Sequence, residues 1–413
     1  MARLQPFRAW RPRPELAAEV ASPPYDVLSS EEARRMAEGN PLSFLHVGKP
    51  EIDLPPGTDV YSGAVYAKGA ESLQQLIADG VLVREPAPAL YLYRQRMGDH
   101  VQTGVVAGAS VDEYEADLIK KHEHTRMAKE DDRTRHIDAL DAQTGPVFLT
   151  YKARPEIDAI VSRLAAAAPA YDFVAPDGIQ HVVWEISKPR DREALVAAFV
   201  PVPVMYVADG HHRSAAATRV RAQRRQANPG HTGEEGYNFF LAVIFPHDQM
   251  QILDYNRVVK DLQGRTVDAF LAAVEERFQV VPVERGRPDR PRCFGMYLGG
   301  RWYRLTAKPG SYPAADPVRS LDAAILQDNL LGPWLGIGDP RKDERIDFVG
   351  GIRGLGELER LVDSGRFAVA FAMHPTSIEQ LFAVADAGRV MPPKSTWFEP
   401  KLRDGLIVRP LED

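Results

Sequence analysis

Cysteine is almost absent from the chain, since Cys293 is the only one among 413 residues. A single cysteine excludes an internal disulfide and a zinc site built from cysteine ligands. Long apolar runs are also missing, because no stretch approaches the roughly 18 residues that a membrane-spanning helix needs. The first residues, Met1–Arg8, lack the apolar segment of a secretory signal. We therefore predict a cytoplasmic protein with no membrane partner.

A surplus of positive charge is lacking as well. The chain has 51 lysines and arginines against 57 acidic residues, a net charge of −6. Domains that bind nucleic acids usually carry a strong basic surplus. The four arginines Arg219, Arg221, Arg224 and Arg225 cluster on one predicted helix, with acidic residues soon after them. A solvated helix face explains this cluster better than a DNA-reading helix, so nucleic acid is a disfavoured partner.

Signals for hairpins and for helices are mixed along the chain. Strand pairs are predicted around Gly98-Asp99 and around Gly299-Gly300. Helices are predicted over residues 60–79, 155–166 and 267–278, and over a stretch from residue 114 to about 131. Capping boxes at Ser29-Ser30-Glu31-Glu32 and Thr376-Ser377-Ile378-Glu379 mark two further helix starts. This mixture predicts an α+β fold rather than a doubly wound parallel sheet.

The length of the chain predicts two or three domains. No internal repeat and no low-complexity linker marks a boundary between them. The patterns suggest an N-terminal region over residues 1–110, a core over residues 111–265 and a C-terminal α+β region over residues 266–413.

The most informative motif is Asp209-Gly210-His211-His212-Arg213-Ser214. It lies between an apolar run, residues 202–207, and good helix formers, residues 214–226, which indicates a strand, a tight turn and a helix. A helix N-terminus favours anions, and arginine and histidine add donors for a phosphate. Asp209 would repel a phosphate unless it holds a metal ion, orients a histidine or accepts a proton. A plain surface turn capped by an aspartate is the alternative interpretation.

Residues Asp209–Arg213 resemble the phosphate-binding motif of the free-serine kinases of the ParB/sulfiredoxin superfamily. The resemblance implies a ParB/sulfiredoxin-like nucleotide-binding core around residues 200–226. It also implies that His212 and Arg213 touch nucleotide phosphates. His211 stands where sulfiredoxins have their reactive cysteine, so sulfiredoxin chemistry is not implied.

Further stretches resemble a bacterial domain-of-unknown-function family, numbered 1015, over nearly the whole chain. These stretches are Ser22–Val27, His122–Thr125 with Asp132-Arg133, Leu335–Arg341 and Met391–Phe398. The name of that family implies no reaction.

The stretch His122-Glu123-His124 has side chains that can bind metals. On a helix, residues two apart point in different directions, whereas on a strand or extended loop His122 and His124 would share a face. Zinc needs three or four converging ligands, so the spacing supports zinc poorly. We interpret Glu123 as a general base or magnesium ligand that the fold brings near Arg213. A charged surface helix is the alternative. Further along, Lys394, within Pro392–Trp397, lies beside serine and threonine and could contact a phosphate, although the spacing of a P-loop is absent.

Together these patterns predict a nucleotide-dependent phosphotransferase that uses ATP or ADP with Mg²⁺ on a small hydroxylated metabolite. Serine is a candidate acceptor only through the resemblance. A phosphatase of a phosphorylated metabolite, and a ParB-like nucleotide-binding switch without a small-molecule acceptor, are the alternatives. The sequence leaves the acceptor, the nucleotide and the oligomeric state open. The predicted catalytic residues are Glu123, Asp209 and His211, the predicted nucleotide-binding residues are Gly210, His212, Arg213, Ser214 and Lys394, and the predicted metal ligand is Asp209.

Overall fold

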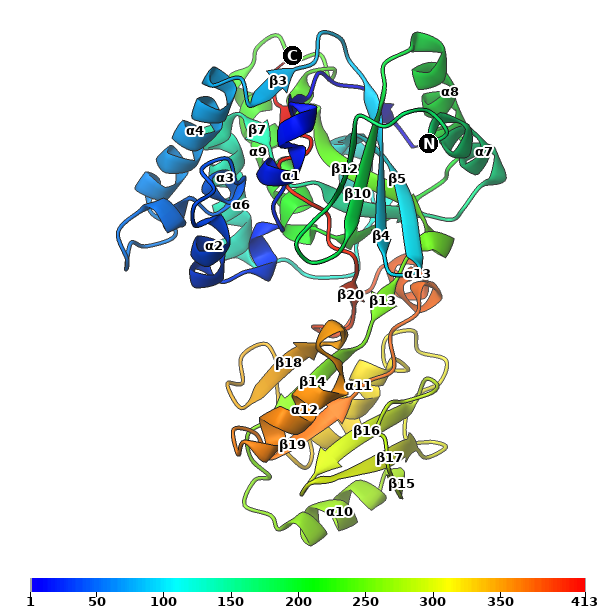
Figure 1. Ribbon diagram of the computed structural model, residues 1–413. Helices are drawn as coiled ribbons and strands as arrows, with labels where there is room; N and C mark the ends of the chain where they lie inside the picture. Colours follow the sequence, from blue (N-terminus) through cyan, green and yellow to red (C-terminus); the bar gives the residue numbers. More distant parts are fainter. Residues whose placement is uncertain (1, 413) are drawn as a thin grey trace. The chain divides into compact units, whose positions relative to one another are not determined.

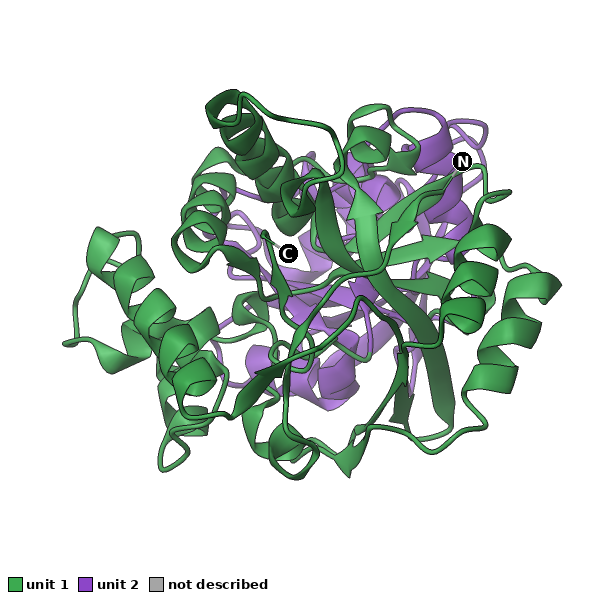
Figure 2. Cartoon of the chain, turned by 90° about the horizontal axis from the view of Figure 1, so that it is seen from above, with its two compact units in different colours: residues 1–250, 400–413 green, residues 251–399 purple. Residues whose placement is uncertain are grey.

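The computed structural model describes residues 2–412, which fold as two compact units. The first unit comprises Met1–Met250 and Pro400–Asp413, and the second comprises Gln251–Glu399 (Figure 2). The chain therefore leaves the first unit after residue 250 and returns to it at residue 400. These limits lie at positions other than 110 and 265, where the sequence suggested boundaries.

A nine-stranded mixed sheet forms the centre of the first unit. In spatial order its strands are β6 (Ile119–Lys120), β11 (Met205–Asp209), β8 (Val147–Tyr151), β12 (Phe239–Pro246), β5 (His100–Ser110), β4 (Leu90–Met97), β10 (Gln180–Ile186) and β9 (Tyr171–Val174), and β1 (Leu4–Gln5) pairs with β5. All eight residues of β12 are buried, which agrees with its uninterrupted apolar sequence. The hairpin predicted around Gly98-Asp99 is confirmed as β4 and β5.

Helices pack around this sheet, and in Figure 1 α7 and α8 lie on one side of the strands with α4 and α6 on the other. The helices of the first unit are α1 (Ala17–Val20), α2 (Ser30–Ala37), α3 (Leu45–Gly48), α4 (Gly63–Ala78), α5 (Val111–Glu115), α6 (Met127–Leu140), α7 (Pro155–Leu164), α8 (Pro189–Phe199) and α9 (His211–Ala227). Helix α2 has the predicted capping box, since Ser29 and Glu32 bond each other's backbone N–H groups.

The arginines on α9 are bound to acidic side chains. Arg219 contacts Asp131 at 2.5 Å, and Arg224 contacts Asp138 at 2.8 Å. Arg221 pairs with both Asp112 and Glu115. The positive charges of Arg219, Arg221 and Arg224 are therefore compensated within the unit.

Residues 400–412, which we call the return segment, run through the interior of the first unit. Apolar residues of this segment are buried, Val408 completely. The backbone of Asp404 pairs with that of Ser22, and the backbone of Val408 pairs with that of Trp10. Near its end, β21 (Arg409–Pro410) pairs with β7 (Ala142–Gln143). The return segment is thus an integral part of the first unit.

The second unit is a six-stranded sheet with four α-helices among the described residues. In spatial order its strands are β15 (Phe278–Val283), β17 (Arg301–Ala307), β16 (Cys293–Leu298), β19 (Val369–Ala372), β14 (Tyr255–Val259) and β18 (Ile346–Gly350), and its helices are α10 (Val267–Glu275), α11 (Asp322–Leu326), α12 (Gly354–Asp363) and α13 (Ile378–Asp386). The hairpin predicted at Gly299-Gly300 is confirmed. The capping box of α13 is Ser377 with Gln380, one residue later than predicted.

Three short ribbons complete the list of strand pairs: β2 (Trp10–Pro12) with β3 (Leu82–Arg84), β13 (Ile252–Leu253) with β20 (Trp397–Phe398), and the β7–β21 pair. The predicted α+β fold with mixed sheets is confirmed, since both units combine helices with sheets of largely antiparallel strands. Within residues 2–412, no helix combines the length and the apolar character needed to cross a membrane.

Candidate functional site

The motif lies where β11 meets α9. Asp209 is the last residue of β11, Gly210 has φ 96°, and α9 begins at His211. The left-handed conformation of Gly210 is one that residues with a Cβ adopt only at a cost, and a Cβ there would approach Val147 at 3.3 Å. The prediction that the helix begins at Ser214 is wrong by three residues. His211, His212 and Arg213 therefore form the first turn, where backbone N–H groups lack helical partners.

The carboxylate of Asp209 is held by the residues around it. One oxygen accepts a hydrogen bond from the backbone N–H of Gly210 at 2.8 Å, and the other accepts one from Nζ of Lys401 at 2.9 Å. Burial alone would raise the pKa of Asp209, but the charges of Lys401 and Arg213 outweigh burial and hold this pKa well below its usual value. Asp209 is therefore ionised at neutral pH.

Arg213 is a buried cation with only part of its hydrogen-bonding capacity used. Its guanidinium donates to the backbone oxygen of Pro146, and it lies 3.5 Å from both carboxylate oxygens of Asp26. Its Nε has no hydrogen-bond partner within residues 2–412. Asp26 lies in the 3-10 helix η2 (Tyr25–Val27). Arg213 thus links the α9 motif to the N-terminal stretch, Ser22–Val27, that the sequence had singled out.

The stretch with His122 is a loop and not the predicted helix. Helix α5 ends at Glu115, β6 pairs in parallel with β11, and α6 begins only at Met127. This pairing places residues 121–126 beside the first turn of α9. We call these residues the histidine loop.

Two neutral histidines meet at this point. The rings of His122 and His211 lie edge to face with centroids 4.5 Å apart. Burial lowers the pKa of His122 to about 4, and burial together with the neighbouring His122 lowers that of His211. Nε2 of His211 has no hydrogen-bond partner in the described chain. At neutral pH both rings are therefore uncharged, and His211 retains an unused nitrogen.

Glu123 lies beside His211, with its Oε2 3.9 Å from Nδ1 of that histidine. The side chain of Glu123 is half exposed (52%), so a small molecule can reach it. The backbone N–H of Arg126 donates to Nε2 of His212 at 3.1 Å and fixes the other end of the histidine loop on α9. The predicted proximity of Glu123 and His122 to the motif is confirmed, while their roles remain predictions.

Two other predicted residues lie in different surroundings. Ser214 is fully buried, and its hydroxyl donates to the backbone oxygen of His211 at 3.1 Å. Lys394 belongs to the second unit, where it has φ 56° and its backbone oxygen accepts a hydrogen bond from Arg257. The other predicted residues all belong to the first unit.

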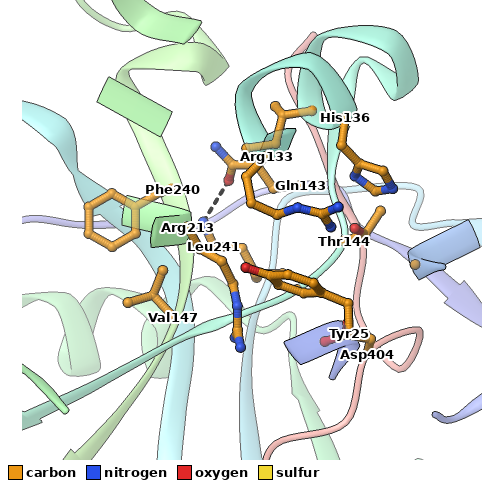
Figure 3. Close-up of a pocket in the computed structure, with 13 residues that line it drawn as sticks. Tyr25, Arg133, His136, Gln143, Thr144, Val147, Arg213, Phe240, Leu241 and Asp404 are labelled. Atoms are coloured by element: carbon orange, nitrogen blue, oxygen red, sulfur yellow. Dashed lines mark hydrogen bonds between the residues drawn. The ribbon is translucent and has the colours of Figure 1, made fainter. Parts of the chain in front are cut away.

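Figure 3 shows a small cavity, about 30 Å³ in volume, that Arg213 lines together with Tyr25, Arg133 and Asp404. The guanidinium carbons of Arg133 and Arg213 lie 3.9 and 5.8 Å from the centroid of the Tyr25 ring. Asp404 is only 4% exposed, and its Oδ1 has no hydrogen-bond partner in the described residues. Burial raises the pKa of Asp404 to about 7, although the charge of Arg213 opposes this rise. The cavity therefore combines an apolar lining, which includes Val147 and Phe240, with two guanidinium groups and a carboxyl group whose pKa lies near neutrality.

Sequence reasoning missed Asp26, Arg133, Lys401 and Asp404 as members of the site. Asp26 and Arg133 lie in the stretches Ser22–Val27 and Asp132-Arg133, which resemble a known family. That resemblance was the signal that could have identified these two residues. No such signal was noted for Lys401 and Asp404, which reach the site through the return segment.

A metal centre made by the protein alone is not found in the part of the chain that the structure describes. No group of three or more His, Cys, Asp or Glu side chains within residues 2–412 is arranged to hold one ion. Magnesium often uses only one or two carboxylates and completes its shell with phosphates and water. Asp209 offers one ionised carboxylate at the motif, and its two oxygens are bonded to Gly210 and Lys401.

A family model matches residues 4–324 of the chain. The chain belongs to the family described as "Protein of unknown function (DUF1015)". No curated protein matches this DUF1015 chain.

Solved structures similar to this DUF1015 chain include three with a TM-score of 0.36. A free serine kinase mutant in complex with AMP is 10% identical, and the match covers 71% of this chain and 87% of the kinase. A conserved hypothetical protein from Pyrococcus furiosus is 11% identical over 74% of this chain and 95% of its own. The C-terminally truncated SbnI from Staphylococcus aureus is 13% identical over 74% and 87%.

Proposed function

We propose that this DUF1015 protein is a phosphotransferase that binds a nucleotide by its phosphates at the first turn of α9. The observation that supports this most is the meeting of the histidine loop with α9. Three contacts join them. The ring centroids of His122 and His211 lie 4.5 Å apart, and Oε2 of Glu123 lies 3.9 Å from Nδ1 of His211. The backbone N–H of Arg126 donates to Nε2 of His212 at 3.1 Å. The resemblance of the motif to that of free-serine kinases points in the same direction.

The contacts bring together the groups that phosphoryl transfer requires. That reaction depends on positioning and on neutralising phosphate charge more than on covalent chemistry. The first turn of α9 supplies backbone N–H groups and a partial positive charge. Arg126 adds an exposed side chain with no ion-pair partner in the described residues. His212 and Arg213 strengthen the same anion-binding end of the helix.

Glu123 is the proposed general base. It is the carboxylate of the histidine loop that a substrate can reach, and it lies next to His211, whose ring is neutral. In this role it accepts the proton of the acceptor hydroxyl while His211 keeps the carboxylate in place. The proposed acceptor is a small hydroxylated metabolite, with serine as the first compound to test.

Asp209 is the proposed protein ligand of Mg²⁺. Its carboxylate stays ionised because Lys401 and Arg213 lower its pKa, so it can accept a cation that arrives with the nucleotide. A bound Mg²⁺ would supply neutralisation of the phosphate charge. Asp209 would hold that ion close to the first turn of α9, and Lys401 would keep the carboxylate oriented.

The test compares Glu123→Gln with the unchanged chain. Glu193→Gln on α8 is the matched control, because Glu193 is exposed and lies outside the site. Calorimetric titration measures affinity for ATP and ADP with Mg²⁺, and phosphorus NMR measures product formed from a panel of hydroxylated metabolites. We expect Glu123→Gln to keep nucleotide affinity within a few-fold and to lower phosphorylation by about 10²-fold or more.

Other outcomes would identify the alternatives. Slow nucleotide hydrolysis without any acceptor, unaffected by Glu123→Gln, would favour a nucleotide-binding switch. Release of phosphate from a phosphorylated metabolite without nucleotide would favour a phosphatase. A native chain that binds no nucleotide would overturn the assignment of the motif to a nucleotide site.

A further inference from the structure

Three carboxyl groups surround Arg213. Asp26 lies 3.5 Å from its guanidinium, Asp209 belongs to the same motif, and Asp404 of the return segment lines the same cavity (Figure 3). Burial lowers the pKa of Arg213, but the charges of these three carboxyl groups outweigh burial and raise it. A phosphate that approaches Arg213 therefore meets negative charge as well as positive charge.

The side chains of Asp404 and Arg213 lie close together inside this cavity. A Cβ at Gly145 would stand 3.2 Å from Oδ1 of Asp404 and 3.4 Å from Cδ of Arg213, so both atoms lie within 3.4 Å of one point. Oδ1 of Asp404 and Nε of Arg213 each lack a hydrogen-bond partner in the described residues. The carboxyl group therefore acts on Arg213 through its charge, without a hydrogen bond between these two atoms.

The backbone fixes Asp404 in this place. Its N–H donates to the backbone oxygen of Ser22 at 3.0 Å, and its own oxygen accepts a hydrogen bond from the N–H of Ser22 at 3.1 Å. The preceding residue, Arg403, is anchored separately, since its Nε donates to His181 and its guanidinium pairs with Asp177. Asp404 is thus a fixed part of the cavity wall, and the property that can change is its charge.

The three carboxyl groups differ in their surroundings. Asp209 is held ionised by Lys401 and Arg213. The side chain of Asp26 is partly exposed (38%), whereas Asp404 is only 4% exposed. Burial raises the pKa of Asp404 to about 7, although the charge of Arg213 opposes this rise. Near neutral pH the protonated and ionised forms of Asp404 are therefore present in comparable amounts.

The other charged and titratable groups around Asp404 come from η2, α6 and the return segment. They are Tyr25, Asp26, Arg133, His136 and Arg403. Burial raises the pKa of Tyr25 and lowers that of His136 to about 4, so both rings are neutral near pH 7. Arg133 pairs with Asp132 at 2.9 Å. Among the residues that line the cavity, Asp404 is therefore the group that titrates near neutrality.

We infer that nucleotide binding at Arg213 is coupled to the uptake of one proton by Asp404. The inference rests on the proposed nucleotide site. A phosphate beside Arg213 adds negative charge near the carboxyl group, and a nearby like charge favours the protonated form. By linkage, the protonated form then binds the phosphate more tightly than the ionised form does. Asp404 is a positioning residue in this role, because it acts on the phosphate through Arg213, and its proton comes from the solvent.

The test is calorimetric titration of the full chain with ADP and Mg²⁺ at pH 7.5, in buffers that differ in their enthalpy of ionisation. The dependence of the measured heat on the buffer gives the number of protons taken up on binding. Native chain, Asp404→Asn and Asp404→Ala are compared, and Asp79→Asn is the control, because Asp79 is exposed at the end of α4. The protons that ADP itself gains or loses are the same with every chain, so the difference between chains isolates Asp404.

We expect the native chain and Asp79→Asn to take up more protons than the two Asp404 variants. The difference is about half a proton per nucleotide if the phosphate raises the pKa of Asp404 by one unit. The same rise lowers the affinity of the native chain about fivefold between pH 6 and pH 8. The dissociation constant of the native chain, divided by that of Asp404→Asn, is therefore expected to increase at least threefold over this range.

The outcomes separate this inference from the proposed function. Equal proton uptake and parallel pH profiles in the native chain and both Asp404 variants, with native circular dichroism, would overturn the inference and leave the proposed function in place. A loss of affinity in the variants that is the same at every pH would show a purely structural role for Asp404 and would also overturn it. A native chain that binds no nucleotide would overturn both.

Discussion

Replacing Asp404 by asparagine is expected to change the pH dependence of stability in a defined direction. The carboxyl group of Asp404 is buried, and its pKa is about 7 in the folded chain against an ordinary value of 3.8. Between these two pH values the folded state binds a proton that the unfolded state has lost. The free energy of unfolding therefore falls as pH rises through this range. Asparagine cannot ionise and avoids this loss.

The size of the effect follows from the same two values. A pKa difference of one unit corresponds to about 1.4 kcal/mol. Above pH 7 the raised pKa of Asp404 therefore lowers the free energy of unfolding of the native chain by about 4 kcal/mol. We expect Asp404→Asn and the native chain to differ little near pH 4. At pH 8 the variant is expected to be more stable, by up to about 4 kcal/mol.

Urea denaturation of the full chain between pH 4.5 and 8.5, followed by tryptophan fluorescence, measures this difference. Asp79→Asn is the control, because Asp79 is exposed at the end of α4. Buried histidines are present in both variant and native chain, so their own titration largely cancels in the comparison. A difference that stays constant with pH, or a variant that is less stable at pH 8, would refute the reasoning.

Three further predictions concern the same unit. Lys401→Met leaves the carboxylate of Asp209 without its lysine and is expected to cost about 3–5 kcal/mol in urea denaturation, most of which the double variant with Asp209→Asn should recover. Gly210→Ala puts a Cβ at φ 96° beside Val147 and is expected to cost about 1–2 kcal/mol or more, measured by thermal unfolding. Burial lowers the pKa of His136 from 6.5 to about 4, so its contribution to stability is present above pH 6.5 and is lost as pH falls toward 4. His136→Gln should therefore flatten acid destabilisation by up to about 3 kcal/mol, and an unchanged acid profile in urea denaturation would contradict this assignment.

Local structure could be predicted where a few neighbouring residues decide it. The capping box at Ser29, the Gly98-Asp99 hairpin and the strand–turn–helix at Gly210 each depend on contacts within a few residues. The histidine loop could not be predicted in this way. Its sequence is rich in helix formers, but the pairing of β6 with β11, nearly ninety residues away, holds it in a non-helical conformation.

The site could be predicted only in part for the same reason. The motif itself indicated an anion-binding helix end, and Glu123 was correctly expected near it. Arg213 meets Asp26 across 187 positions, and Asp209 meets Lys401 across 192. Ion pairs between such distant segments leave no periodic pattern in the sequence, so these partners emerged only from the fold.

The position of the return segment at the end of the sequence sets the order in which parts of the first unit become available during translation. Residues 251–399 are synthesised before Lys401 and Asp404. The ion pair between Asp209 and Lys401 can therefore form only after the entire second unit has been synthesised. At about 5–20 residues per second, those roughly 150 residues take on the order of ten seconds or longer. During this interval the first unit also lacks Val408, which is completely buried in the finished fold. Throughout this interval the proposed nucleotide site lacks Lys401, the residue that holds the carboxylate of Asp209.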